Sequence, residues 1–366
     1  MKIACLVSGG VDSSVALALA KESGYEVHAF YLKIWLEEET AFLGECPWEN
    51  DLSFVRSVCE KLNVPLTIVP LQKQYHSRVI SYALSEVRQG RTPNPDIMCN
   101  SLIKFGAFQE WLEENNLCFE KIVTGHYAQS SEYRDREGKT FPIMKLAKDK
   151  VKDQTYFLSR LSRKQLSKIW FPLGGYEKSE VRQKAKEKKL LTFDRPDSQG
   201  LCFLGKIRYS DFIKHHLGTL SGNIVDISTE NILGKHEGHW LYTIGQRHGL
   251  DLSGGPWYVV GKDISHNILF VSHRLKMPQI EKETFIVKDV QWFLDKEELC
   301  KMFLSKEMFC KVRHGEKMYR IILGKSAKDS DTFSVRILDE KERGITPGQF
   351  AVFYTEDLCL GGGVIE

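Results

Sequence analysis

The sequence predicts an α/β N-terminal domain built on a parallel sheet, a small mixed middle domain and a C-terminal antiparallel β-barrel. Three observations support this fold class. Strand-like apolar runs alternate with amphipathic helical segments over the first part of the chain, as in a doubly covered parallel sheet. After about residue 205 the chain becomes rich in Gly, His and aromatic residues. From residue 283, short alternating strands follow one another with turn signals between them.

The N-terminal elements alternate in the order expected of a parallel sheet. Strands are predicted at 2–7, 26–34, 64–71 and 121–129, and helices at 12–23, 51–63 and 101–114. The segment that follows, up to about residue 149, predicts a hairpin on the edge of this domain. Helical patterns resume from Gln154 to about Leu190.

A chain of 366 residues is too long for one compact core. We expect boundaries that give domains at 1–205, 206–282 and 283–366. The content of 42% apolar and 27% charged residues is ordinary for a globular protein. The sequence contains no apolar run of roughly 18 residues, which disfavours a membrane helix, and its first residues predict a strand and not a targeting segment. We therefore expect a cytoplasmic protein.

The formal net charge is +3, so a surface for nucleic acid would have to be local. Nine cysteines, an odd number, disfavour a disulfide framework, and the lack of CxxC spacing disfavours a structural zinc site. Most free cysteines are buried small hydrophobes. Cys99 ends the proline-containing stretch RTPNPDIMCN (91–100), where it could be a metal ligand, a core residue or a nucleophile.

The heptapeptide SGGVDSS (8–14) lies between the first predicted strand and the first helix. Its glycines allow a ligand to approach the backbone closely, and the helix N-terminus favours phosphate. It has neither the lysine of a Walker A motif nor the dinucleotide-binding spacing. Asp12 would repel a bare phosphate, so we expect Mg²⁺ between them. The other interpretation is a tight turn with a capping serine.

This heptapeptide resembles the pyrophosphate-binding loop of the ATP pyrophosphatase superfamily. Seven further motifs resemble, in order, those of the tRNA-specific 2-thiouridylases: GRTPNPDIMCN (90–100), TGHYA (124–128), KDQTYFLSRL (152–161), FPLGGYEKSEVR (171–182), DSQGLCFLG (197–205), YTIGQRHGL (242–250) and PWYVVGKD (256–263). The resemblance spans most of the chain. It implies an enzyme that uses ATP to adenylate the 2-position oxygen of the wobble uridine in tRNA and then replaces that oxygen with sulfur.

The resemblance also implies roles for individual residues. Cys202 would carry sulfur as a persulfide, supplied by a sulfur-relay protein, and Cys99 would be the partner nucleophile. Sulfur transfer needs two such thiols, because the second can attack the persulfide and leave a transient disulfide. Asp96, three residues before Cys99, is placed to act as a general acid or base. The target uridine lies in an anticodon loop, from which it can be flipped out.

The family's nucleotide contacts correspond to Leu6, Val7, Ser8, Gly9, Gly10, Val11, Asp12, Ser13, Leu32 and Gly125. Its tRNA contacts correspond to Asn94, Pro95, Asp96, His126, Lys152, Asp153, Gln154, Arg313, His314 and Gln349. Leu32 and His314 depart from the residues most frequent in the family. A dense run of Lys and Arg over residues 145–168 predicts a local basic face, although an ordinary solvated helix face gives the same pattern.

Two other functions are weighed against this one. A small-molecule ligase of the same superfamily would use the nucleotide loop but would leave Cys99, Cys202 and the barrel without a role. A nucleotide-sensing RNA-binding module would explain the basic run but not the two cysteines. The sequence therefore favours the RNA-modifying sulfurtransferase.

Overall fold

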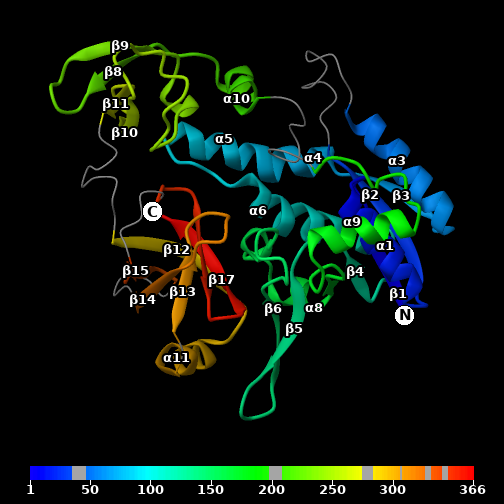
Figure 1. The fold of residues 1–366 in the computed structure, drawn as a ribbon. Helices are drawn as coiled ribbons and strands as arrows, with labels where there is room; N and C mark the ends of the chain where they lie inside the picture. The colour runs from blue at the N-terminus through cyan, green and yellow to red at the C-terminus, as the bar shows by residue number, and fades with distance from the viewer. Residues whose placement is uncertain (35–46, 198–207, 274–282, 306, 326–330, 340–344) are drawn as a thin grey trace.

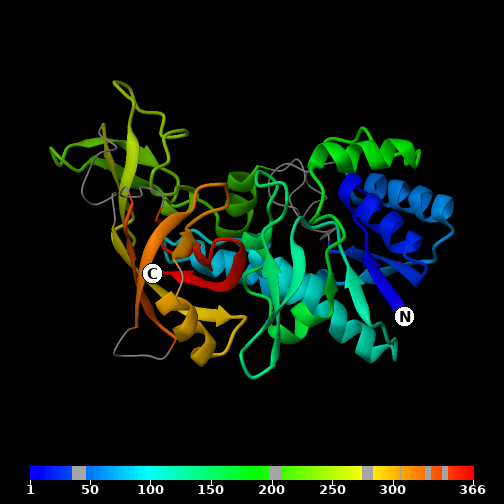
Figure 2. The same cartoon turned by 60° about the horizontal axis from the view of Figure 1, so that its bottom comes forward.

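The chain folds into three parts, each built around its own sheet (Figure 1). The computed structural model describes residues 1–34, 47–197, 208–273, 283–305, 307–325, 331–339 and 345–366. The N-terminal sheet lies at one end of the molecule, and the other two sheets lie beside each other at the opposite end (Figure 1 and Figure 2). The described residues contain no helix that is long and apolar enough to span a membrane.

The N-terminal sheet has five parallel strands in the order β3-β2-β1-β4-β7. Their bounds are β1 Lys2–Leu6, β2 Glu26–Lys33, β3 Leu66–Pro70, β4 Lys121–Val123 and β7 Ile169–Trp170. Strand β1 lies between β2 and β4, so the strand order reverses there. Ligands of open parallel sheets bind at the carboxyl ends of the strands beside such a reversal.

Strand β1 explains why both faces of this sheet are covered. Its alternate residues Ile3 and Cys5 belong to one hydrophobic cluster, and Ala4 and Leu6 belong to another. The first cluster lies under α1 (Val11–Glu22), α3 (Pro47–Leu62) and α9 (Lys178–Glu187). The second lies under a helical layer made of α4 Gln72–Tyr75, η2 His76–Ile80, α5 Ser81–Arg88, α6 Pro95–Cys99, η3 Asn100–Ala107 and α7 Phe108–Glu114.

The middle part is a small sheet in the order β10-β11-β8-β9. Its elements are α10 Tyr209–Leu217, β8 Gly222–Asp226, β9 Ile232–His236, η5 His239–Leu241, β10 Tyr258–Asp263 and β11 Ile268–Ser272. It has a core of its own, which includes Ile224, Val259 and Leu269. The composition change after residue 205 thus corresponds to a separately packed unit.

The C-terminal part is a closed antiparallel barrel, because β12 pairs with both β15 and β17. Its elements are β12 Thr284–Trp292, α11 Lys296–Ser305, β13 Met308–Lys311, β14 Tyr319–Lys325, β15 Phe333–Ile337, β16 Phe350–Tyr354 and β17 Leu358–Ile365. Gly361 has φ +128°, and a Cβ there would lie 1.9 Å from the Gln291 carbonyl oxygen. Closure between β12 and β17 therefore requires glycine at this position. The predicted fold class is confirmed.

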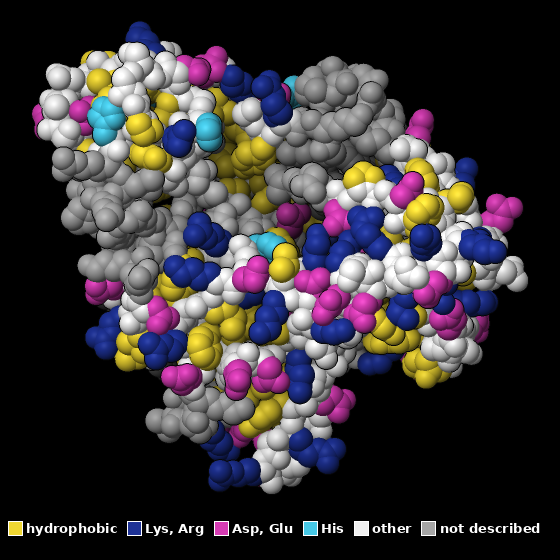
Figure 3. All heavy atoms as spheres, in the orientation of Figure 1, with side chains coloured by type: hydrophobic (Ala, Val, Ile, Leu, Met, Phe, Trp, Pro, Cys, Tyr) yellow, Lys and Arg dark blue, Asp and Glu magenta, His cyan; other side chains and the backbone are white. Residues whose placement is uncertain are grey.

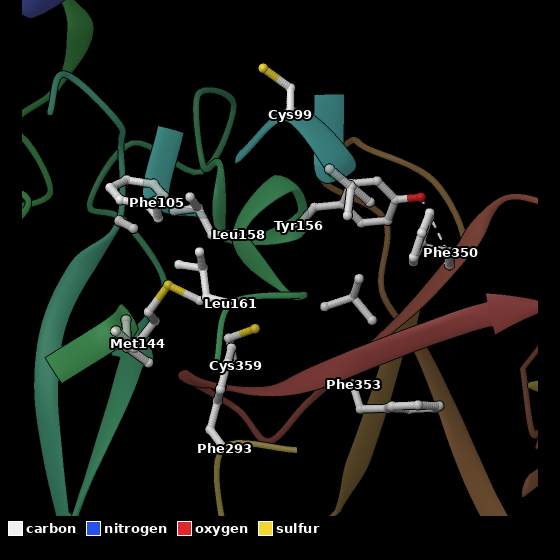
Figure 4. Packing of buried hydrophobic residues seen from close by; sticks show 14 of the residues in the cluster. Cys99, Phe105, Met144, Tyr156, Leu158, Leu161, Phe293, Phe350, Phe353 and Cys359 are labelled. Carbon is white, nitrogen blue, oxygen red and sulfur yellow. Dashed lines mark hydrogen bonds between the residues drawn. The ribbon is translucent and has the colours of Figure 1, made fainter. Parts of the chain in front are cut away.

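The predicted hairpin forms from β5 (Gln129–Arg134) and β6 (Thr140–Lys145), but its sheet partner differs from the prediction. It does not extend the N-terminal sheet. Strand β6 pairs with β17, with Met144 opposite Cys359. Apolar residues of β6 and of the barrel share one cluster, joined by the turn η4 (Thr155–Leu158) and the segment before α8 (Arg163–Ser167) (Figure 4). Burial of this shared apolar surface explains the pairing.

Candidate functional site

The glycine-rich loop, residues 8–14, turns sharply from β1 into α1. Gly9 has φ +80°, and a Cβ there would lie 2.6 Å from the Asp51 carbonyl oxygen. Only glycine fits such a position without strain. The Ser13 hydroxyl accepts a hydrogen bond from the Ser8 backbone N–H at 3.1 Å and donates to the Gly10 carbonyl oxygen at 3.1 Å. Gly10 is the N-cap residue of α1 and makes no side-chain capping bond. The backbone N–H groups of the first turn of α1 are therefore not occupied by a capping side chain from Gly10.

Gly125, which follows β4, forms the opposite wall of this loop. A Cβ at Gly125 would lie 2.6 Å from the Ser13 nitrogen and 2.7 Å from the Asp12 carbonyl carbon. The structure therefore brings two predicted nucleotide-binding segments into direct backbone contact. Leu6 and Val7 are buried beneath the loop, and Leu32 is partly buried on the neighbouring strand β2.

Asp12 is bound by two groups from other parts of the chain. Lys178 Nζ lies 2.7 Å from Asp12 Oδ1 and 2.8 Å from Oδ2, and the Tyr127 hydroxyl donates to Oδ1 at 2.8 Å. Burial and the charge of Asp12 raise the pKa of Tyr127, so this phenol stays a donor. Asp12 was predicted to face Mg²⁺, and here its carboxylate faces a lysine.

The carboxylate of Asp197 forms ion pairs with three cations. It lies 2.8 Å from Lys178 Nζ, 2.7 Å from Lys152 Nζ and 2.8 Å from a guanidinium nitrogen of Arg182. Burial alone would raise the pKa of Asp197, but hydrogen bonds from Lys152 and Lys178 lower it to about 2. Lys152, a predicted tRNA contact, is thus engaged with a carboxylate. Lys178 joins this cluster to the glycine-rich loop.

Arg195 holds the other side of the loop. Its guanidinium donates to the Gly9 carbonyl oxygen at 2.6 Å and to Asp51 Oδ1 at 2.7 Å, and it lies 4.3 Å from the centre of the Phe54 ring. The chain just before residue 198 is therefore fixed to the nucleotide-binding loop at two points, Lys178–Asp197 and Arg195–Gly9. Cys202 lies outside the described residues, so its predicted pairing with Cys99 stays a prediction.

Cys99 ends the short helix α6, whose start is fixed by the preceding loop. Asn94 Oδ1 accepts a hydrogen bond from the Ile97 backbone N–H at 3.3 Å, and Pro95 occupies the first helical position. Both features are typical of helix starts. Cys99 is 1% exposed. Figure 4 shows its sulfur pointing away from Tyr156 and Leu158. Asp96 is partly buried on the same helix.

Several other cysteines fit the prediction of core residues. Burial raises the pKa of the Cys59 thiol to about 11 and that of Cys359 to about 12, and it also raises the pKa of Cys5 and Cys310. Such thiols remain protonated and unreactive at neutral pH.

His126 lies beside the nucleotide-binding wall, between the rings of Phe105 and Phe171. Its Nδ1 is 2.8 Å from the Thr124 hydroxyl. Burial and the nearby charge of Lys104 lower its pKa well below the ordinary value, so the ring is neutral near pH 7. A neutral imidazole at this position can accept or donate a hydrogen bond to a base but contributes no charge to phosphate binding.

Asp153 and His314, two predicted tRNA contacts, meet each other at the junction with the barrel. The Asp153 carboxylate is buried, accepts from the Ala147 N–H at 2.8 Å and lies 3.5 Å from the buried Lys311 Nζ. His314 Nε2 donates to the Asp153 carbonyl oxygen at 3.2 Å, and its ring stacks on Phe157 with centroids 4.6 Å apart. The structure places the Asp153 side chain in an interdomain contact, whereas Arg313 is exposed.

The remaining predicted RNA contacts also make contacts within the chain. Gln154 Oε1 accepts from the Tyr127 N–H at 3.0 Å. Gln349 Nε2 donates to the carbonyl oxygens of Thr92 and Pro93 at 3.0 and 3.2 Å. Gln349 therefore connects the barrel to the loop that precedes Asn94.

The basic run over residues 145–168 does not form an isolated cationic face. Lys145 and Lys148 pair with Asp357 and Glu180 at 3.5 and 2.9 Å, and Arg163 pairs with Asp295. Figure 3 shows Lys and Arg side chains interleaved with Asp and Glu across the face that it presents. With Lys152, which pairs with Asp197, half of these eight cations pair with a carboxylate of the described residues, which a local concentration of Lys and Arg in the sequence does not show.

Comparison with known proteins covers nearly the full chain. Three family models match in order: the tRNA methyl transferase HUP domain over residues 1–206, the tRNA methyl transferase PRC-barrel domain over 210–273 and the aminomethyltransferase beta-barrel domain over 282–365. A tRNA-specific 2-thiouridylase of Parabacteroides distasonis is 44% identical, covering 100% of this chain and 99% of its own. Enzymes of the same name from Porphyromonas gingivalis and Bacteroides thetaiotaomicron are 42% and 40% identical over the same shares.

The chain belongs to the tRNA-specific 2-thiouridylase family. A solved 4-thiouridine synthetase–RNA complex with bound ATP is 21% identical over 56% of this chain and 45% of its own. The TM-score of this comparison is 0.35.

Three residues that contact the glycine-rich loop or its ion pairs were not among the predicted site residues. Lys178 and Asp197 lie within two of the quoted motifs, but no role was assigned to them, and Arg195 lies outside any motif. A lysine on a helix usually faces solvent. Its convergence on Asp12 depends on the tertiary structure, since 166 residues separate the two.

Proposed function

We propose that this 2-thiouridylase catalyses ATP-dependent 2-thiolation of the wobble uridine of tRNA. The observation that carries the proposal is identity of 40–44% over the full chain with relatives named tRNA-specific 2-thiouridylase. The site geometry agrees with it, because a glycine-rich loop suited to phosphate lies at the carboxyl end of β1 and a helix bearing Asp96 and Cys99 lies in the same domain.

The nucleotide step uses the glycine-rich loop. The amide groups at the start of α1 and the backbone at Gly125 would hold the phosphates of ATP, which supplies the adenylyl group for the uridine 2-oxygen. Lys178 would either neutralise phosphate charge or keep its ion pair with Asp12. The described residues contain no cluster of three metal-ligating side chains. We propose that Mg²⁺ enters with ATP and that the carboxylate of Asp12 would help to hold it.

The sulfur step uses two thiols. In this proposal a relay protein loads Cys202 with a persulfide. The Cys99 thiolate attacks the Cys202 sulfur, the sulfur–sulfur bond breaks, and hydrosulfide leaves. Hydrosulfide then attacks C2 of the adenylated uridine, and AMP leaves with the original oxygen. The products are 2-thiouridine and a Cys99–Cys202 disulfide, which a cellular dithiol must reduce before the next turnover.

Asp96 and the RNA contacts complete the proposal. Asp96, on the same short helix as Cys99, would accept the thiol proton. The predicted contacts at Asn94, Pro95, His126, Lys152 and Gln154 would orient the flipped base and its flanking nucleotides. Arg313, His314 and Gln349 would contact tRNA from the barrel side.

The domain boundaries and the compartment also belong to this proposal. Domains at 1–205, 206–282 and 283–366 would divide catalysis from two RNA-contacting units. We place the enzyme in the cytoplasm, where thiols are kept reduced and Cys99 can act as a nucleophile in each turnover. A small-molecule ligase with the same nucleotide loop is not favoured, because it would leave both cysteines without a role.

Mass analysis of nucleosides tests the proposed function. Unmodified tRNA transcript is incubated with the full chain, ATP, Mg²⁺ and sulfide, and then digested. We expect 2-thiouridine from the wobble position only when ATP is present. A transcript with cytidine at that position serves as the matched control. A methylated product, or no modified uridine, would contradict the proposal.

A further inference from the structure

The segment from the last residue of α5 to the residue before α6, residues 88–94, is contacted by both of the other parts of the chain. We call this segment the linker. It passes from the end of α5 toward α6, which carries Asp96 and Cys99 (Figure 1). Within its own domain it is tied back by the Arg91 N–H, which donates to the Glu86 carbonyl oxygen at 3.0 Å, and by an Arg91–Glu86 ion pair.

The middle part holds the first half of the linker. Lys262 Nζ donates to the Gly90 carbonyl oxygen at 3.2 Å, and His239 Nε2 donates to the Arg88 carbonyl oxygen at 3.2 Å. Gly90 has φ +73°, and a Cβ there would lie 2.4 Å from Ile264 Cδ1. Lys262 is half-buried, and burial lowers its pKa to about 8.

The barrel holds the second half. The Thr92 N–H donates to the Pro347 carbonyl oxygen at 2.8 Å. Gln349 Nε2 donates to the carbonyl oxygens of Thr92 and Pro93 at 3.0 and 3.2 Å. Gly348 has φ +90°, and a Cβ there would lie 2.9 Å from the Thr92 nitrogen. The barrel backbone therefore lies directly against the linker.

These contacts lie next to the start of α6. Pro93 and Asn94 are consecutive, and Asn94 caps α6 through the Ile97 N–H. A displacement of either the middle part or the barrel thus moves the backbone that fixes the first turn of α6. The bonds go to main-chain carbonyls, so they set the path of the linker whatever its side chains are.

We propose that Lys262 and His239 of the middle part, with Gln349 of the barrel, are positioning residues for the α6 segment. When tRNA binds to these two parts, their contacts with the linker set the positions of Asp96 and Cys99 on α6. The inference rests on the proposed function, since it assigns the α6 segment to sulfur transfer. It adds a route by which the RNA-contacting parts set the geometry of the reaction without contacting the target base.

Replacement of Lys262 by Met tests the inference, because Met keeps the apolar stem and removes the donor to Gly90. With saturating tRNA transcript, ATP, Mg²⁺, a persulfide donor that loads Cys202 and a dithiol, we expect the thiolation kcat of K262M to fall about tenfold, and the Kd for tRNA to stay within about twofold of wild type. K262R keeps a cationic donor and should regain most of the kcat. K235M removes an exposed lysine of the same part and should leave kcat unchanged.

Alkylation of Cys99 in the absence of tRNA separates positioning from RNA binding. Cys99 is 1% exposed, so iodoacetamide reaches it only when α6 moves. Peptide mass spectrometry follows this residue alone. We expect alkylation of Cys99 to be at least about threefold faster in K262M than in wild type, K262R or K235M.

The outcomes are distinguishable. Equal kcat and equal alkylation in K262M and wild type would overturn the inference, as would a loss confined to tRNA affinity. If K262M does not fold, the pair H239L and H239Q repeats the test, because only Gln retains a donor toward Arg88. A wild-type enzyme that thiolates no tRNA would contradict the proposed function, and alkylation would still report on the linker.

Discussion

The ammonium of Lys178 lies 2.7 and 2.8 Å from the two carboxylate oxygens of Asp12, although 166 residues separate them in sequence. The same ammonium lies 2.8 Å from Asp197 Oδ1. One lysine on α9 therefore joins the nucleotide-binding loop to the chain immediately before the segment that contains Cys202.

Replacement of Lys178 by Met should disable the nucleotide step. Without the ammonium, the carboxylates of Asp12 and Asp197 lose the cation that they share, so net negative charge beside the phosphate-binding loop increases. We expect kcat/KM for ATP to fall roughly 100-fold, because a charged group at a phosphate site is removed. Pyrophosphate release measures this step. K186M, which changes an exposed lysine on the same helix, should behave like wild type, and equal loss in both variants would contradict the role of Lys178.

Asp197 should make stability depend on acidity. Its pKa in the folded chain is about 2, below the ordinary 3.8. A lowered pKa stabilises the folded state above the unfolded value and loses that effect as the pH falls toward the folded value. The contribution is about 2 kcal/mol above pH 5, roughly half of it remaining at pH 3. In urea unfolding, the difference in the free energy of unfolding between wild type and D197N should become smaller as the pH falls from about 5 to 3. A constant difference would show that the three cations do not set this pKa.

The Asp153–Lys311 pair should be a stabilising link between the first part and the barrel. Both side chains are nearly fully buried, so removing one leaves the other charged and uncompensated. We expect K311M to lower the free energy of unfolding by about 3 kcal/mol, and the double variant D153N/K311M to recover part of it. Strictly additive effects of the two substitutions in urea unfolding would argue against a direct pair.

Substitution of the two reactive cysteines should separate the two chemical steps. Cys202→Ser should abolish thiolation while pyrophosphate release with tRNA continues, because adenylation needs no thiol. Cys99→Ser should allow persulfide loading of Cys202 and block release of the sulfur. Cys59→Ser, which changes a buried core thiol, is the matched control. Normal thiolation by either reactive-cysteine variant would remove that residue from the mechanism.

Much of this architecture could be predicted from local sequence patterns. The apolar run at 2–7 and the glycine-rich loop after it predict a strand, a turn and a helix, and the structure has β1, the Gly9 turn and α1. Alternating strands after residue 283 predict the barrel. These features follow from periodicity and backbone sterics, which act over a few residues.

Contacts between distant segments could not be predicted in this way. The hairpin 129–145 has the alternation of an edge strand, but nothing local shows that β17 is its partner. The cations at 145–168 look like a basic face until Asp357, Glu180 and Asp295 are brought beside them. Asp153 lies in a polar stretch and is nevertheless buried against Lys311. Each of these depends on tertiary packing between parts of the chain.

A single-turnover reaction without reductant tests the central claim most directly. Enzyme carrying persulfide on Cys202 is mixed with unmodified tRNA, ATP and Mg²⁺, and the products are measured by mass spectrometry of nucleosides and of peptides kept under non-reducing conditions. The mechanism predicts one Cys99–Cys202 linked peptide for each 2-thiouridine formed. Formation of 2-thiouridine with both cysteines left unlinked would contradict it.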